Sequence, residues 1–257
     1  VKLGRDTGNT LWARAHGSSE DDYARALAIV GSDVIVVGQS RGAFDFDATP
    51  NNGNEVTAAA GGTDIFVARP EDNATSAKWA QSWGSATDDS AAAVAVVGTR
   101  VVAAGKMSGP IDFGQGVIQN TGTDGVVLNM FASTGVVNWS QSFANGIVRG
   151  VALASDGGLY VAGGSSGGKS ANLGGGPLPN AGSSDLFVGK LAATGSLVWG
   201  ASYGSANPDA STVSGIAASG KRVVVFSFAE GAIDFGKGPL SHAGKEDALL
   251  VGFSATP

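Results

Sequence analysis

Three aspartates recur at equivalent places, each five residues after a glycine: Asp22 after Gly17, Asp89 after Gly84 and Asp209 after Gly204. Carboxylate and carbonyl oxygens are the ligands that hard cations prefer. A ring of these carboxylates at the mouth of a narrow channel predicts a Ca²⁺ or Na⁺ site. The alternative is that each aspartate accepts hydrogen bonds from nearby backbone N–H groups in a turn. No fourth aspartate stands in the corresponding place between Asp89 and Asp209, so the ring would be incomplete.

A second set of candidate binding residues lies four positions after Trp12, Trp79, Trp139 and Trp199: His16, Trp83, Phe143 and Tyr203. Residues an even number apart on a β-strand share one face, so Arg14, Gln81 and Gln141 lie on the same strand faces. Aromatic rings flanked by such polar groups predict a site that stacks on sugar rings. Packing of these rings between adjacent elements of the protein is the alternative.

Two patterns typical of enzymes are present without the elements that they need. Gly163–Ser170 matches a phosphate-binding loop, and Gly38–Gly42 and Gly163–Gly167 match a nucleophile elbow. Both chemistries require a helix directly after the turn, and neither match is followed by a helical pattern. We therefore expect no catalytic residue and no enzymatic activity. The oxygen-rich stretch over residues 45–55 is a further candidate calcium loop, although its spacing matches no defined loop.

The elements that position these residues are repeated. The intervals between the four tryptophans are 67, 60 and 60 residues. Each interval holds four short segments rich in β-branched or small apolar residues and separated by Gly, Ser, Asn and Asp, which is typical of strands. No segment has the sustained apolar periodicity and caps of a helix. A repeat of this length must be interpreted before any local motif.

Four antiparallel strands repeated around an axis predict an all-β fold, a four-bladed β-propeller. We expect a single domain over 1–257, with blades at about 17–84, 85–143, 144–203 and 204–257. The last blade lacks its Trp strand, so Leu11–His16 is predicted to complete it and close the ring. However, Val1-Lys2-Leu3 resembles the end of another third strand. A chain cut from a longer repeat array is therefore the alternative.

Composition narrows the class of partner. The chain is 43% hydrophobic and 15% charged, so it can bury a sizeable core. Its net charge of −6 and the absence of a Lys/Arg stripe argue against nucleic acid as a partner. No apolar run approaches the roughly 20 residues that span a bilayer. The absence of cysteine excludes disulfides and thiolate metal sites.

Several motifs recur in the same order in the repeats: Ile111–Gly114, Ile233–Leu240, Gly174–Leu178, Ala60–Val67 and Ala181–Val188. In this order of motifs the whole chain resembles the bacterial SBBP-type β-propeller repeat family, found in exported and surface proteins including those of myxobacteria. The resemblance implies a propeller fold, a secreted or cell-surface location, no general enzymatic activity and no agreed ligand. The third repeat departs from the pattern, with Ala171-Asn172-Leu173 where others have an aspartate between apolar residues.

The connections of a blade emerge alternately on two faces, and one face receives the long ones: 45–63, 114–123, 168–184 and 236–246. Variable loops on a rigid scaffold are where binding usually resides. We therefore expect a non-enzymatic binding module that recognises carbohydrate or protein through this long-loop face. A structural or spacer unit of a larger surface protein is the alternative, and a polysaccharide-acting enzyme is a more remote one.

Overall fold

The structure is a computed structural model that describes residues 1–46, 55–56, 61–72, 75–120, 122–206, 213–220 and 222–254. Every regular element in these ranges is a β-strand, and none is a helix. The described part therefore also contains no helix that is long and apolar enough to cross a membrane. The all-β class predicted from the sequence is confirmed. Asp209 and most of the candidate calcium loop over 45–55 lie outside the described residues.

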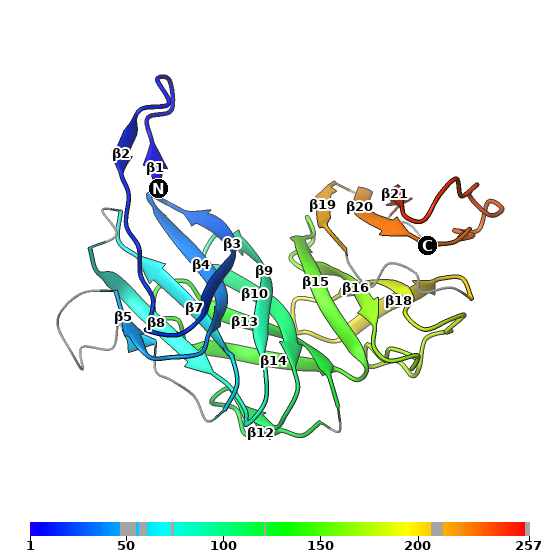
Figure 1. Cartoon of the computed structure of the whole chain (residues 1–257), viewed down its shortest axis with the longest axis horizontal. Helices are drawn as coiled ribbons and strands as arrows, with labels where there is room; N and C mark the ends of the chain where they lie inside the picture. Colours follow the sequence, from blue (N-terminus) through cyan, green and yellow to red (C-terminus); the bar gives the residue numbers. More distant parts are fainter. Residues whose placement is uncertain are drawn as a thin grey trace.

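Four antiparallel sheets, numbered here in chain order, make up the body of the protein (Figure 1). Sheet 1 contains β3 (Asp22–Val30), β4 (Asp33–Ser40), β7 (Asp64–Pro70) and β8 (Ala77–Trp83). Sheet 2 contains β9 (Ser90–Val97), β10 (Arg100–Met107), β13 (Asp124–Phe131) and β14 (Val137–Phe143). Sheet 3 contains β15 (Gly146–Leu153), β16 (Leu159–Ser165), β17 (Leu186–Leu191) and β18 (Leu197–Tyr203). Sheet 4 contains β19 (Gly215–Ser219), β20 (Arg222–Ala229) and β21 (Asp247–Ser254).

Three small hairpins complete the described strands. The long loops of sheets 1 and 2 each carry a two-stranded ribbon, formed by β5 (Phe44–Asp45) with β6 (Glu55–Val56) and by β11 (Ile111–Asp112) with β12 (Val117–Ile118). The third hairpin is N-terminal, formed by β1 (Lys2–Leu3) and β2 (Thr10–Trp12), and stands away from the sheets (Figure 1).

The sheets follow one another side by side, with their first strands innermost, because β3 contacts β9, β9 contacts β15, and β15 contacts β19. Ile35, Val37 and Trp79 of sheet 1 share a buried cluster with Val101 and Leu128 of sheet 2. Similar clusters join sheets 2 and 3 and sheets 3 and 4. This arrangement is propeller-like, as the sequence predicts.

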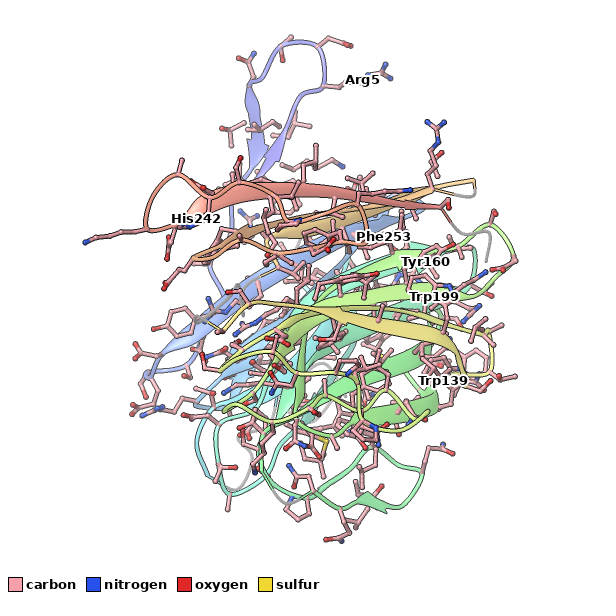
Figure 2. All side chains as sticks on the ribbon, turned by 90° about the vertical axis from the view of Figure 1, so that its right-hand side faces the viewer. Arg5, Trp139, Tyr160, Trp199, His242 and Phe253 are labelled. Carbon is pink, nitrogen blue, oxygen red and sulfur yellow. The ribbon has the colours of Figure 1, made fainter. Side chains whose placement is uncertain are left out.

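Trp79 and Trp139 form hydrogen bonds between neighbouring sheets. Trp79 Nε1 donates to the carbonyl oxygen of Ala132 in the following sheet at 2.9 Å, and Trp139 Nε1 donates to that of Ala193 at 3.0 Å. Each ring also covers a turn glycine of the next sheet, where an added Cβ would lie 2.5 Å from Trp79 at Gly135. Trp79 and Trp139 therefore pack between adjacent sheets. Trp199 packs against the cluster that joins sheets 3 and 4, and its ring also faces Tyr160 of its own sheet, with ring centroids 6.4 Å apart (Figure 2).

The predicted closure of the ring is not what the structure shows. Sheet 4 has three strands in the described part of the chain, and Thr10–Trp12 pairs with Lys2–Leu3 instead of β21. The Lys2↔Trp12 and Leu3↔Thr10 pairs repeat the register of Lys190↔Trp199 and Leu191↔Leu197 within sheet 3. The resemblance of Val1-Lys2-Leu3 to a third strand is therefore structural. A short local loop costs less closure entropy than a contact between the two ends of the chain. β1 therefore occupies the edge of β2 to which β21 was expected to bind.

Candidate functional site

An open cavity of about 630 Å³ lies where the innermost strands of the sheets meet. Its walls come from β3, β4, β9, β10 and β15, and from Val213 and Ser214 before β19. Asp21, Arg41, Thr63 and Asp88, which also line the cavity, lie in connections between strands at the end of the sheets from which the long loop over 45–63 emerges. The cavity thus opens at the face where binding is expected.

Four cationic side chains line this cavity, contributed by three sheets: Arg25, Arg41, Lys106 and Arg149. We call it the cationic cavity. Two carboxylates, Asp21 and Asp88, also line it, so its wall carries more positive than negative charge although the whole chain is acidic. Asp88 is engaged by the Thr63 N–H at 2.8 Å. This hydrogen bond outweighs the effect of burial and, with the charges of Lys106 and Arg41, lowers the pKa of Asp88.

A repeated β-bulge aims residues into the cavity. In β3 the pairing with β4 skips Arg25, in β9 the pairing with β10 skips Ala92, and in β15 the pairing with β16 skips Arg149. All three skipped residues line the cavity. A bulge leaves one residue without a ladder partner and redirects its side chain. The inner strands therefore present one position per sheet to the centre, and two of the three hold arginine.

The bulges explain a glycine in the second strand of sheets 1, 2 and 3. A Cβ on Gly38, Gly105 or Gly163 would lie 1.9 Å from the carbonyl oxygen of Tyr23, Ser90 or Ile147 in the bulged strand. Only glycine allows so close an approach between the two backbones. In sheet 4, where β19 pairs with β20 without a register shift, the corresponding residue is Ser227.

Arg149 is the most constrained cation of the cavity. Its Nε atom is buried and has no hydrogen-bond partner in the part of the chain that the structure describes. Burial, and then the charge of Arg25, hold the pKa of Arg149 below its usual range. An unpaired buried donor of a charged group is costly, and two guanidinium groups repel one another. An anion placed between them would relieve both costs.

Asp22 and Asp89 accept hydrogen bonds from nearby backbone N–H groups, as expected if they stabilise turns instead of binding a cation. Asp22 Oδ2 accepts from the Ser18 N–H at 2.5 Å and from the Ser18 hydroxyl at 2.8 Å. Asp89 Oδ2 accepts from the Ser85 N–H at 2.6 Å, and its Oδ1 accepts from the Ser108 N–H at 2.7 Å. Donors therefore point at the oxygens that a cation would need. No group of three acidic or histidine side chains suited to a metal occurs among the described residues.

The predicted aromatic set lies apart from the cationic cavity. Trp83, Phe143 and Tyr203 lie at boundaries between sheets, whereas His16 lines, together with Arg14, a separate pocket of about 370 Å³ on sheet 1. Phe143 is completely buried in the cluster of Leu173, so its ring is not accessible to a ligand. The other three rings each contact a phenylalanine of the long loop that follows, at centroid distances of 4.8 Å for His16–Phe46, 5.7 Å for Trp83–Phe113 and 4.9 Å for Tyr203–Phe235. These contacts are those expected if the rings pack against other elements of the protein instead of stacking on a sugar.

The three polar residues predicted beside these rings do not join the cationic cavity either. Arg14 is exposed and donates to the carbonyl oxygen of Ala13 next to it at 2.9 Å. Gln141 donates to the carbonyl oxygen of Ser142 at 3.1 Å, and Gln81 faces Val67 in the ladder of sheet 1. None of the three is among the residues that line the cavity.

The enzyme-like patterns take up structural roles. No helix follows Ser170, and Asn172 Oδ1 accepts hydrogen bonds from the N–H groups of Gly174 and Gly176 at 2.8 and 3.1 Å. Asp112 and Asp234 bind the equivalent glycines in the same way. The departure of the third repeat is therefore conservative, because an amide oxygen replaces a carboxylate oxygen as acceptor. In the Gly38–Gly42 match to a nucleophile elbow, the hydroxyl of the central Ser40 forms hydrogen bonds to Asp22 and to the Gly42 carbonyl oxygen, which is a structural role.

The cationic residues escaped the sequence analysis because they are scattered over the chain and form no stripe. The signal that points to them is the doubled occurrence of arginine one residue before the small apolar run of an inner strand, at Arg25 and Arg149. Arg41 and Lys106 have no such signal, and only folding brings them to the same cavity.

Comparison with known proteins gives little further information. No family model matches the chain, and no curated protein is similar to it. Among solved structures, the chain is similar to the crystal structure of BamB from Moraxella catarrhalis, with 14% sequence identity and a TM-score of 0.37. The match covers 95% of this chain and 62% of BamB. At this TM-score the likeness adds nothing to the fold, which is established by the strand pairings.

Proposed function

We propose that this protein is a non-catalytic binding module and that its ligand is an acidic carbohydrate held in the cationic cavity. The observation that supports this best is the buried, unpaired Nε of Arg149 beside Arg25 at the long-loop face. A secreted or cell-surface location, implied by the repeat resemblance, belongs to the same proposal.

The charge of the wall selects the ligand class. Guanidinium groups recognise carboxylate or sulfate oxygens through paired N–H donors, and such charge-assisted hydrogen bonds are about twice as strong as neutral ones. Arg25 is already oriented by its stacking over Tyr23 at 4.8 Å, and one of its N–H groups reaches Gln39 Oε1 at 3.4 Å. Its remaining donors are available to an anion.

The size and the other lining groups favour a sugar over a protein surface. A concave space of about 630 Å³ lies in the range of small-molecule sites. Gln39, Thr63, Ser90 and Ser214 add amide and hydroxyl groups that suit a polyhydroxylated ligand. Tyr23 also lines the wall and is 43% exposed, so its ring is accessible for stacking.

The experiment measures binding of uronic acid oligosaccharides and of neutral oligosaccharides of equal length by calorimetry. Arg149→Gln is the test variant, and Arg5→Gln is the matched control, because Arg5 loses the same charge from an exposed position on the protruding N-terminal hairpin (Figure 2). We expect the acidic ligand alone to bind. Loss of one charged hydrogen bond, worth about 1.5–3 kcal/mol, should weaken this binding at least tenfold in Arg149→Gln and leave Arg5→Gln unchanged.

Equal binding of acidic and neutral sugars would refute the proposal, as would full affinity in Arg149→Gln. Binding of a polyglutamate peptide without binding of any glycan would overturn the carbohydrate assignment and keep the anion site. Added salt should weaken binding, because both partners are charged.

A further inference from the structure

The row of sheets ends in two apolar surfaces that none of the other sheets 1–4 covers. One of them forms a pocket with the N-terminal segment, which Val1, Trp12 and His16 line together with Leu27, Val34 and Val36. At one end, the leading face consists of side chains of β3 and β4 in sheet 1: Leu27, Ile29, Val34 and Val36. At the other end, the trailing face consists of side chains of β20 and β21 in sheet 4: Val224, Phe226 and Leu250. Leu27, Ile29 and Leu250 are 67%, 70% and 73% exposed, which is unusual for strand residues of this kind.

The leading face corresponds to a surface that is buried inside the protein. Its repeat equivalents in sheet 2 are Val94, Val96, Val101 and Ala103. These four belong to the cluster that sheet 2 forms against Ile35, Val37 and Trp79 of sheet 1, and Val101 and Ala103 are completely buried there. The same positions in sheet 1 have the same apolar character and no sheet in front of them.

The trailing face also corresponds to a surface that is buried inside the protein. Its equivalents in sheet 2 are Val102, Ala104 and Val127, which are at most 1% exposed and pack against sheet 3. Each internal boundary thus joins one trailing-type face to one leading-type face. The chain carries one unused face of each type, at opposite ends of its row of sheets.

We propose that these faces bind one another between copies of this chain, so that the trailing face of one copy packs against the leading face of a second copy. The contact would repeat the geometry of the internal sheet boundaries. It is heterologous, and a heterologous contact leaves one free face of each type on every growing assembly.

The experiment is sedimentation velocity over a concentration series with charge variants of each face. Leu27→Glu blocks the leading face, and Leu250→Glu blocks the trailing face. Both side chains are largely exposed, so folding should be retained. Val117→Glu is the matched control, since Val117 is 55% exposed on β12 outside both faces.

We expect the unmodified chain and Val117→Glu to form assemblies larger than dimers with rising concentration, and each single face variant to associate at least tenfold more weakly. An equimolar mixture of Leu27→Glu and Leu250→Glu should stop at a dimer, because one intact face of each type remains. An unmodified chain that stays monomeric would overturn the proposal. Undiminished association of either face variant alone, or a mixture that does not dimerise, would also overturn it.

Discussion

Replacement of Gly105 by alanine tests whether the bulge in an inner strand requires a glycine in the strand opposite it. The new Cβ would lie 1.9 Å from the Ser90 carbonyl oxygen and 2.8 Å from the Ala91 Cα. Both atoms are backbone, so no side chain can rotate out of the way. To reach even 3.0 Å, the inner strand must shift by about 1.1 Å relative to β10, the difference between 3.0 and 1.9 Å.

The magnitude follows from what such a shift breaks. Loss of about two ladder hydrogen bonds costs about 2 kcal/mol, and residual overpacking adds about 1–3 kcal/mol. We therefore expect Gly105→Ala to lower the free energy of unfolding by about 3–5 kcal/mol, which for a chain of this size lowers the melting temperature by roughly 10 °C.

The assay is urea unfolding followed by tryptophan fluorescence, with Gly252→Ala as the control. Gly252 also lies in a strand, but a Cβ added there meets nothing within 4 Å. Its replacement should change stability by no more than about 1 kcal/mol, in the stabilising direction. If both variants unfold at the same urea concentration, the close approach of the bulge does not explain the glycine, and the reasoning fails.

Three further outcomes are expected. Burial alone would raise the pKa of Asp22, but its hydrogen bonds from Ser40 and Ser18 together outweigh burial and lower the pKa. In Asp89, burial outweighs the hydrogen bonds from Ser108 and Ser85 and raises the pKa. In ¹³C NMR titrations, the pKa of Asp22 should therefore lie below 3.8, and the stability that its carboxylate contributes should be lost as pH falls through this pKa. The pKa of Asp89 should lie above 3.8, and the protein should lose stability as pH rises towards it. The opposite order of the two pKa values would contradict this. Asp33→Asn should cost about 2 kcal/mol in urea unfolding, because the buried carboxylate pairs with Arg69 at 2.8 Å and Lys78 at 2.7 Å; an unchanged midpoint would show that these pairs contribute nothing. Trp139→Phe should cost about 1 kcal/mol through loss of its 3.0 Å hydrogen bond to the next sheet, and a neutral result in thermal melts would refute that role.

Much of the fold is determined by local sequence. The spacing of the tryptophans predicts the repeat, and each third strand, turn and Trp strand lie close enough in sequence to pair as a hairpin. The register around Trp139 and Trp199 is the same for that reason. The packing of Trp79 and Trp139 on the next sheet was also predictable, because a large apolar residue on a short strand needs a neighbouring sheet to bury it.

The candidate site depended on tertiary structure. Arg25, Arg41, Lys106 and Arg149 are separated by tens of residues, and only the packing of inner strands from neighbouring sheets places them around one cavity. The bulges, which aim two of these arginines inward, are marked in the sequence only by the glycines opposite them, Gly38, Gly105 and Gly163, and a recurring glycine does not by itself indicate a cavity. The sequence instead directed attention to residues that recur in the repeats, and in this structure such residues mostly maintain the repeat itself.

The sequence alone predicted the main strands of the repeats and their order, because these follow from local propensity and the two-residue period, but it did not predict the short ribbons β5–β6 and β11–β12 in the long loops. Whether Thr10–Trp12 pairs with β1 or with β21 was decided only in three dimensions, since both partners offer equivalent edges. The local hairpin prevails because its loop costs less entropy to close. The same choice leaves the leading and trailing faces uncovered, which no pattern of single residues could have revealed.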